Sequence, residues 1–269
     1  MARLDDDLAL AHVLADTADS IAMARFKALD LYVESKPDLT PVSDADTAVE
    51  KALRSTLART RPRDGVLGEE YGVTGANSNR QWVIDPIDGT NNFIAGLGNF
   101  AVCIGLLDQG MPVLGAVYDV TRDTMYAAAK GEGAWVGTKR MRALDTPMSD
   151  SAMLMLTSNL IDKTGRCPQW ACQWLGQTVW KTRILGSAAL EAIYVAAGVA
   201  HGAVTVNGKL WDAAAPAAIL LEAGATMTDL SGNPIFPFRL ANYAGAKVPF
   251  LAAGPAAHRE LLQQIRAHP

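Results

Sequence analysis

The spacing of apolar residues changes along this chain, and each change marks a different kind of element. From Leu4 to Val33 the apolar residues recur every three or four positions, which predicts one face of a long amphipathic helix. A loop with two prolines follows, and the apolar residues from Val49 to Leu57 predict a second helix that ends at Arg61–Arg63. Two helices are therefore expected before any strand.

Short apolar runs separated by turn residues come next and predict a sheet of meandering strands. These runs are Val66–Leu67, Gln81–Ile84, Ala101–Leu107, Val113–Tyr118 and Thr124–Ala129. After about Asp150 strands and helices are expected to alternate, which is typical of an α/β arrangement. The expected order is a strand at Met153–Thr157, a strand at Val179–Leu185, a helix at Ala188–Ala197, a strand at Ala203–Val206 and a helix at Ala213–Ala223.

The fold class predicted is thus α+β followed by α/β, with an N-terminal half at residues 1–150 and a C-terminal half at residues 151–269. No long linker separates the halves, so we expect one packed unit with a site between them. The net charge of −4 and the scattered Lys and Arg residues argue against nucleic acid as a partner. The acidic start and the absence of a long apolar stretch argue against export and a membrane span, and three unpaired cysteines favour reduced thiols in the cytoplasm.

Acidic residues follow two of the predicted strands. Asp85 and Asp88 come directly after the run Trp82–Ile84, with Pro86 between them, and Glu69 and Glu70 follow Val66–Leu67. A tight turn can aim two carboxylates at one point, where they repel each other unless a cation neutralises them. Mg²⁺ prefers carboxylates, waters and phosphate oxygens as ligands. The pattern therefore predicts a magnesium site at these strand ends.

A purely structural interpretation is open for each piece taken alone. Asp favours turns, so Asp85 and Asp88 fit turn formation, and Glu69 with Glu70 fits a solvated turn. Asp212 precedes an alanine-rich helix and fits an N-cap, with Pro216 close to the helix start. Ser43 and Asp46 match a capping box that opens the second helix.

Three segments taken together resemble the signature motifs of the inositol monophosphatase superfamily. They are GEEYG at 68–72, WVIDPIDGTNNF at 82–93 and LWDAAAPAAILLEAGA at 210–225, and their order and spacing agree with that family. KPDLTPVSDADTAVE at 36–50 extends the resemblance over most of the chain. The resemblance implies the layered αβαβα sugar-phosphatase fold, hydrolysis of a small phosphate monoester and a homodimer.

The resemblance also implies roles for individual residues. Glu69, Asp85 and the Ile87 carbonyl would hold one Mg²⁺, and Asp85, Asp88 and Asp212 would hold a second. A third, looser ion is expected near Glu69 and Glu70, so the family implies two to three ions per subunit, with Mn²⁺ as a possible substitute. Paired metals suit this reaction, since one activates water and the other stabilises the leaving oxygen.

The attacking water would be oriented by Thr90, which is paired with Asp46 as a general base. Glu70 is also expected to be a catalytic residue. The resemblance implies that backbone N–H groups of Gly89, Thr90 and Asn91, at an expected helix start, would donate hydrogen bonds to the phosphate oxygens. The turn of Gly186, Ser187 and Ala188 would line the pocket for the organic part of the substrate.

Two further features of the sequence bear on the choice of substrate. Thr205 stands where inositol phosphatases carry a Glu seven residues before the WD aspartate, which argues against a polyol held through its hydroxyls. The N-terminal motifs resemble the histidinol-phosphatase branch, although Asn91 stands where that branch has Lys. Histidinol phosphate is the expected substrate. The alternatives are inositol 1-phosphate, a broad range of sugar or polyol phosphates, a nucleotide 3'-phosphate, or a metal-dependent binding module without catalysis.

Overall fold

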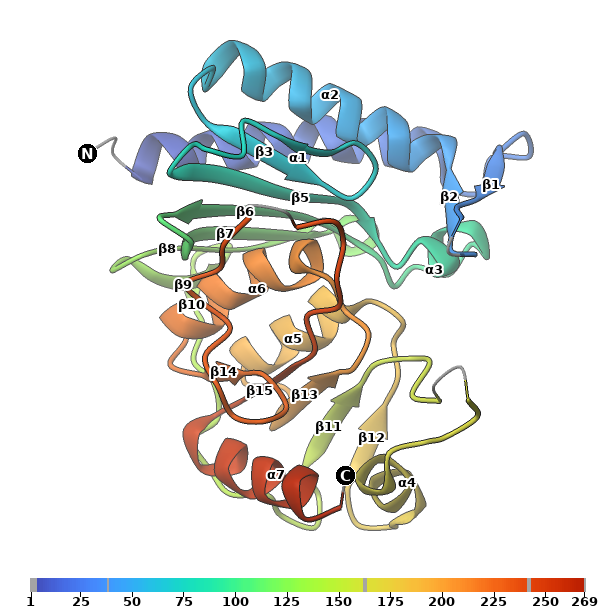
Figure 1. The fold of residues 1–269 in the computed structure, drawn as a ribbon, viewed down its shortest axis with the longest axis vertical. Coiled ribbons are helices and arrows are strands. Elements are labelled where there is room, and N and C mark those ends of the chain that lie inside the picture. Colours follow the sequence, from blue (N-terminus) through green and yellow to red (C-terminus); the bar gives the residue numbers. More distant parts are fainter. Residues whose placement is uncertain (1–3, 38, 162–163, 241–242, 269) are drawn as a thin grey trace.

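The computed structural model describes residues 4–37, 39–161, 164–240 and 243–268, and its elements stack in layers (Figure 1). A pair of helices covers one face of a large sheet, a second pair lies between this sheet and a smaller one, and a third pair covers the far face of the smaller sheet. The order αβαβα confirms the predicted fold class. In layer order the helix pairs are α1 (Leu4–Arg25) with α2 (Asp44–Thr60), α5 (Ala188–Ala196) with α6 (Leu210–Glu222), and α4 (Gln169–Gly176) with α7 (Pro255–Ala267).

The large sheet has eight strands in the order β10-β9-β8-β7-β6-β5-β3-β4. Neighbouring strands are antiparallel except β3 and β5, which run parallel because β3 returns through β4 at the sheet edge. The meander predicted from the apolar runs is therefore confirmed. Its strands are β3 (Gly65–Gly68), β4 (Gly72–Thr74), β5 (Arg80–Asp88), β6 (Ala101–Asp108), β7 (Met111–Asp119), β8 (Thr124–Ala129), β9 (Gly133–Val136) and β10 (Lys139–Arg140).

The smaller sheet has five strands in the order β12-β11-β13-β15-β14 and mixes parallel with antiparallel pairs. The alternation predicted after residue 150 holds from β11 to α6. Helices α4 and α7 and strands β14 and β15 were not predicted from the sequence. The strands are β11 (Met153–Leu156), β12 (Lys181–Arg183), β13 (Gly202–Thr205), β14 (Thr226–Thr228) and β15 (Phe250–Ala253).

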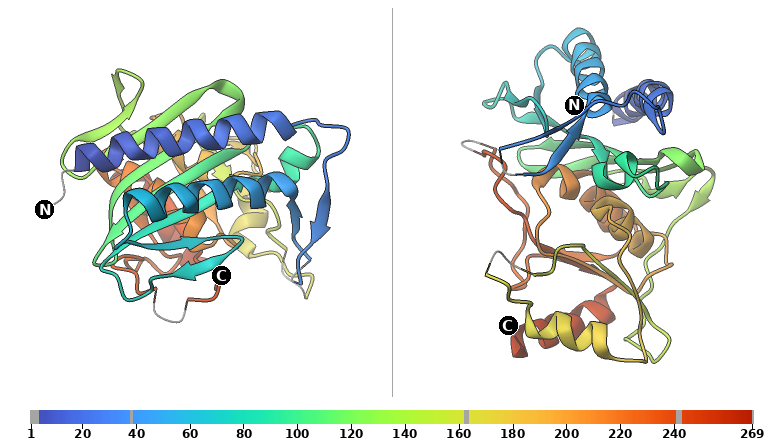
Figure 2. Two further views of the ribbon diagram at one scale, coloured as in Figure 1. Left: turned by 90° about the horizontal axis from the view of Figure 1, so that it is seen from above. Right: turned by 90° about the vertical axis from the view of Figure 1, so that its right-hand side faces the viewer.

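The first helix is shorter than predicted. α1 ends at Arg25, two residues before Lys27 adopts a left-handed backbone (φ 61°). The continued apolar spacing was misleading because Leu29 is fully exposed and packs on nothing. Val33 belongs instead to β1 (Val33–Ser35), which pairs with β2 (Pro41–Ser43) in a hairpin at one end of the layers (Figure 2). This hairpin carries the loop that borders the candidate site.

Helix α6 lies directly on the backbone of β6 and β7. A Cβ added at Gly115 would lie 2.1 Å from the Ala215 carbonyl oxygen, and one added at Gly105 would lie 3.0 Å from the Ala215 nitrogen. The glycines and the alanine face of α6 therefore bring the helix against the sheet. One buried cluster joins side chains from both halves, for example Val83 with Ile219. We propose that residues 1–150 and 151–269 are two halves of one packed unit.

Candidate active site

An irregularity in β5 places two aspartates on one side of the strand. Residues three apart on a regular strand point to opposite faces. The pairing of β5 with β6 shifts between Asp85, opposite Cys103, and Asp88, opposite Ala101, so β5 holds one extra residue there. Pro86 lies in this bulge, where its missing N–H costs no ladder bond. Bulges re-aim side chains, and this one turns both carboxylates toward the same space.

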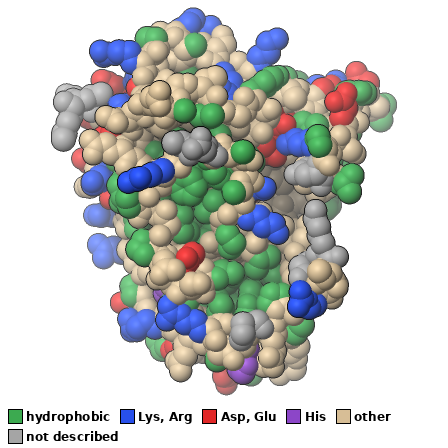
Figure 3. Space-filling view, viewed as in Figure 1, with side chains coloured by type: hydrophobic (Ala, Val, Ile, Leu, Met, Phe, Trp, Pro, Cys, Tyr) green, Lys and Arg blue, Asp and Glu red, His purple; other side chains and the backbone are tan. Residues whose placement is uncertain are grey.

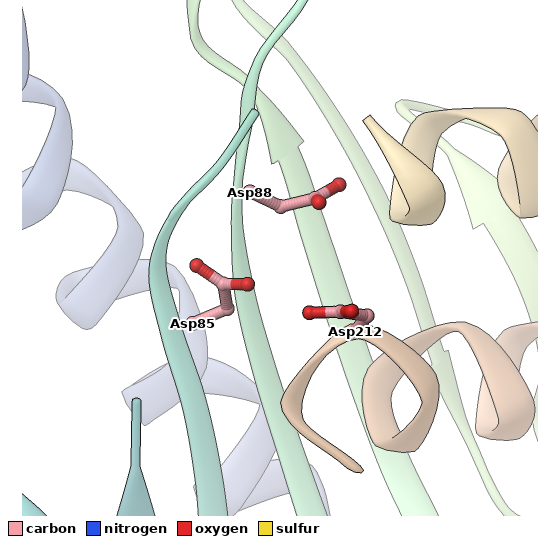
Figure 4. A group of neighbouring side chains, drawn as sticks. All are labelled: Asp85, Asp88 and Asp212. Carbon is pink, nitrogen blue, oxygen red and sulfur yellow. The ribbon is translucent and has the colours of Figure 1, made fainter. Parts of the chain in front are cut away.

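The third aspartate reaches the same space from the other half of the chain. Asp212 is the third residue of α6, and its carboxylate points at those of Asp85 and Asp88 (Figure 4). One oxygen from each of the three side chains lies within 4.8 Å of the others, and Asp85 and Asp88 are buried. The N-cap interpretation of Asp212 is wrong. The cap is Lys209, whose backbone N–H donates to Asp212 Oδ2 (2.8 Å), and Pro216 lies inside the helix.

The electrostatics of the three aspartates fit a cation site. Burial raises the pKa of Asp212 to about 8, with repulsion from Asp88 and Glu69 adding to the shift. Burial, and then Glu69 and Asp88, raise the pKa of Asp85 well above its ordinary value. The raised pKa values show that the aspartates oppose one another's ionisation in the metal-free protein. Hard oxygen donors that repel each other at this spacing suit a divalent cation such as Mg²⁺.

Asp88 also connects the two halves of the chain. Its carboxylate accepts hydrogen bonds from the Ser187 hydroxyl and from the backbone N–H groups of Ala188 (3.2 Å) and Ala189 (2.8 Å) at the start of α5. The start of a helix carries partial positive charge, which favours the ionised form of this group. Burial is nevertheless the larger effect and raises the pKa of Asp88.

The turn after β3 places two glutamates beside the cleft, but they contact a lysine. Lys36 Nζ lies 2.8 Å from Glu69 Oε1 and 2.7 Å from Glu70 Oε1. Burial would lower the pKa of Lys36, and the two carboxylates outweigh it and raise the pKa. Burial, followed by Glu69, raises the pKa of Glu70 to about 7. An additional ion near Glu69 and Glu70 would have to displace this ammonium group.

Glu50 is a supporting residue that the sequence analysis missed. It is fully buried in α2, and its carboxylate accepts from the backbone N–H groups of Glu70 (2.7 Å) and Tyr71 (3.1 Å) and from Arg54 Nε (2.7 Å). These bonds hold the turn that carries Glu69. In the sequence Glu50 is like any other glutamate of an amphipathic helix, so no signal distinguished it from the surface residues of α2.

Thr90 and Asp46 are in contact, as the base assignment requires. The Thr90 hydroxyl lies 3.0 Å from Asp46 Oδ1 and 3.1 Å from the Ile87 carbonyl oxygen, both of which are acceptors. Asp46 Oδ2 accepts from the backbone N–H (2.9 Å) and hydroxyl of Ser43, so the predicted capping box is confirmed as well. One carboxylate therefore contacts both Ser43 and Thr90, and burial raises its pKa.

The sharp entry into α3 (Thr90–Ile94) depends on Gly89. Gly89 has φ 103°, and a Cβ there would lie 2.9 Å from the Asn99 carbonyl oxygen. Asn92, which the sequence analysis also missed, fixes this helix against the other half, because its side-chain amide donates to the carbonyls of Asn99 (2.7 Å) and Leu185 (2.8 Å). The turn at Gly89–Asn91 therefore faces the acidic centre.

A cleft of about 350 Å³ opens over these residues between the halves. Of the expected substrate residues, Gly186 and Ala188 line it, whereas Ser187 turns inward to Asp88 and Thr205 is buried in β13. Asn207, two residues beyond Thr205, lies at the cleft wall instead. On the face shown in Figure 3, Lys and Arg side chains are scattered around an apolar middle. The cleft is lined by Lys36, Thr40, Pro41, Glu69, Asp85, Ile87, Asp88, Gly89, Thr90, Asn91, Thr157, Ser158, Asn159, Gly186, Ala188, Asn207, Gly208, Lys209, Trp211, Asp212, Ala244 and Gly245.

Known proteins are similar to this chain in both sequence and fold. The model of the inositol monophosphatase family matches residues 4–269. The chain is 41% identical to a histidinol-phosphatase of Mycobacterium tuberculosis over 84% of this chain and 88% of that protein. It is 42% identical to a histidinol-phosphatase of Streptomyces coelicolor over 85% of this chain and 88% of that protein. It is 33% identical to an inositol-1-monophosphatase of Bacillus subtilis over 91% of this chain and 90% of that protein.

Solved structures of known proteins superpose on this fold. The extragenic suppressor protein suhB of Bartonella henselae superposes with a TM-score of 0.87 at 28% identity, covering 97% of this chain and 98% of that one. An inositol monophosphatase of Thermotoga maritima superposes with a TM-score of 0.83 at 29% identity, covering 99% and 98%. The fold, the acidic centre and these relatives define a phosphoric monoester hydrolase with a candidate metal site. The chain belongs to the inositol monophosphatase family.

Proposed function

We propose that this protein is a Mg²⁺-dependent phosphatase that hydrolyses histidinol phosphate. The observation that carries the reaction class is the meeting of three carboxylates from both halves at the floor of one cleft. The substrate rests on the 41% and 42% identity to histidinol-phosphatases, against 33% and 37% for two inositol-1-monophosphatases. A homodimer in the cytoplasm is part of the same proposal.

Asp85, Asp88 and Asp212 would hold Mg²⁺ or Mn²⁺, with Glu69 and the Ile87 carbonyl completing a second set of ligands that Asp85 shares. The family's two to three ions would be bound by these groups. When bound, the ions would polarise the phosphate and lower the pKa of water. The donor set fits, because hard carboxylate and carbonyl oxygens are the ligands that these ions prefer.

The residues of the chain itself then position the reactants. The Thr90 hydroxyl can donate its proton to Asp46 and accept a hydrogen bond from water in the cleft, which orients that water and gives its proton a path to a carboxylate. The backbone N–H groups at Gly89–Asn91 face the same space and would bind phosphate oxygens. Glu70, with its pKa raised to about 7, would influence this centre through Glu69 and Lys36.

The organic part of the substrate would lie against the amide and hydroxyl groups on the far wall of the cleft. Thr157 Oγ1 donates to Asn207 Oδ1 (2.9 Å), which directs the Asn207 amide group for further hydrogen bonding. Among the described residues of the cleft, the carboxylates are Glu69 and the three metal-binding aspartates. The substrate ammonium would therefore interact with amide and backbone carbonyl oxygens or with the acidic centre. Gly186 and Ala188, which line the cleft, would contact this part of the substrate.

A panel of phosphate monoesters assayed with Mg²⁺ tests this proposal. Both main candidates present the same phosphate, so discrimination must come from the organic part and should appear in kcat/KM. A charged hydrogen bond to a hydroxyl is worth roughly 1.5–3 kcal/mol, so histidinol phosphate should exceed inositol 1-phosphate by about tenfold or more. Equal rates would favour a broad-specificity phosphatase. Binding of phosphate esters with no release of phosphate would favour the binding module.

A further inference from the structure

Two of the three cysteines lie at the ends of the first turn of α4. Pro168 is the N-cap of this helix, and its carbonyl accepts the backbone N–H of Cys172 (3.1 Å). Cys167 is therefore the residue before the cap, and Cys172 is the fourth residue of the helix. Side chains at these two positions pack on each other across the helix start. The sequence spacing of five matches no redox motif, so the sequence analysis treated these residues as structural thiols.

Their positions on either side of the cap, before Pro168 and one turn into α4, direct the side chains of Cys167 and Cys172 toward each other. Cys172 is close enough to raise the pKa of Cys167. Cys167 is half-buried and packs on the cluster that contains Trp170 and Trp174, whereas Cys172 is exposed. The third cysteine, Cys103, is fully buried in β6 beneath the acidic centre. Solvent therefore reaches the thiol pair and not the third thiol.

A second cavity adjoins this pair. It has a volume of about 380 Å³ and is lined by Cys167 together with Arg166, Lys247 and Asn159. The two cationic side chains favour the approach of an anionic reagent. Asn159 lines the substrate cleft as well, so the thiol pair lies one residue away from the wall of the active site.

We propose that Cys167 and Cys172 form a dithiol site that closes into an intramolecular disulfide by exchange with an anionic low-molecular-weight disulfide such as oxidised glutathione. The Cys172 thiolate attacks one sulfur of the reagent, the reagent's S–S bond breaks and one glutathione thiolate leaves. The Cys167 thiolate then attacks the Cys172 sulfur and releases the second. Both protein thiols are oxidised, the reagent is reduced to two thiols, and the two cysteine protons pass to the leaving thiolates.

The test uses the native full-length chain, incubated with excess oxidised glutathione, quenched with acid and analysed by peptide mass spectrometry. The segment that contains both cysteines should lose two hydrogens, and the three titratable thiols of the denatured protein should fall to one, namely Cys103. A disulfide to Cys103, a cross-link between two chains, a stable glutathione adduct, or no loss of thiols would each overturn the proposal.

Two variants separate the roles within the pair. Cys167→Ser should leave glutathione attached to Cys172, because the resolving thiol is gone. Cys172→Ser should react much more slowly, because the remaining thiol is half-buried. If wild type and Cys167→Ser end in the same adduct, or if Cys172→Ser reacts as fast as wild type, the assignment of attacking and resolving thiols is wrong.

Discussion

At the scale of single residues, the acidic centre stores repulsion that a cation relieves. Asp85 faces both Asp88 and Asp212 and is the residue that the two proposed ligand sets share. We expect Asp85→Asn to abolish most Mg²⁺-dependent turnover and to leave the metal-free protein at least as thermally stable, since one repelling charge is removed. The measurements are phosphate release at saturating Mg²⁺ and a melting curve with chelator. Glu70→Gln is the matched control and should cost less rate. Near wild-type turnover in Asp85→Asn would refute the shared role.

Asp46 combines a structural role with a proposed catalytic one, and substitutions can separate them. Asp46→Asn can keep an oxygen toward Ser43 while losing the carboxylate at Thr90, so kcat should fall with little change in KM. Thr90→Ala should do the same, and the double variant should be no worse than the more affected single one. Ser43→Ala removes only a cap bond and should cost about 1 kcal/mol of stability with kcat retained. A normal kcat in Asp46→Asn would leave capping as its only role.

The raised pKa values give the stability of the metal-free protein a definite pH dependence. Asp212 has an ordinary pKa of 3.8 when unfolded and about 8 when folded, so the folded state holds its proton more tightly. The stability from this group is present below pH 4 and is lost as pH rises toward 8. The melting temperature with chelator should therefore fall between about pH 5.5 and about pH 8.5, whereas stabilisation by Mg²⁺ should grow. A Mg²⁺ effect that is constant across this range would count against the aspartates as ligands.

At the scale of elements, sequence reasoning found the strands and helices whose periodicity is long and regular. It located α2, the meander and α5 because the buried apolar residues of these elements recur at the spacing typical of a helix or a strand. It failed where contacts between distant segments determine the local structure. The bulge in β5 is an example, because it can be recognised only from the pairing register of β5 with β6. The proposed ligands were found because motif residues identify them. Glu50, Glu191 and Asn92 were missed because they act through backbone groups of distant segments.

Glu191 illustrates such a supporting contact in α5. Its Oε1 accepts from the backbone N–H groups of Leu185 (2.8 Å) and Gly186 (3.1 Å). These bonds shape the turn that precedes the residues in contact with Asp88. Burial raises the pKa of Glu191 to about 8. Glu191→Gln should be tolerated, because the amide keeps the accepting oxygen. Glu191→Ala should destabilise by about 1–3 kcal/mol by leaving the donors unpaired, and should reduce kcat. Thermal melts and kinetics of both variants test this, and equal effects would contradict it.

At the scale of the whole molecule, the site exists only because the two halves pack at a fixed separation. Gly115→Ala would place a methyl group on the Ala215 carbonyl, so α6 must move and carry Asp212 with it. We expect lower stability and a higher Mg²⁺ concentration for half-maximal activity. Gly176→Ala, in α4 with open space around it, is the matched control and should be neutral or stabilising. Unchanged Mg²⁺ dependence in Gly115→Ala would show that the helix does not set the ligand geometry.

The close contact between α6 and the sheet also bears on how such a site can change. Three carboxylates accept ions of different radius according to the gap between them. Here that gap is set by the height of a helix above two glycines, at positions that never touch the ion. A single methyl group under α6 would widen the gap by moving Asp212, with the identity of every ligand unchanged. The choice between a smaller and a larger ion can therefore be inherited through the packing of the molecule, with the aspartates unaltered.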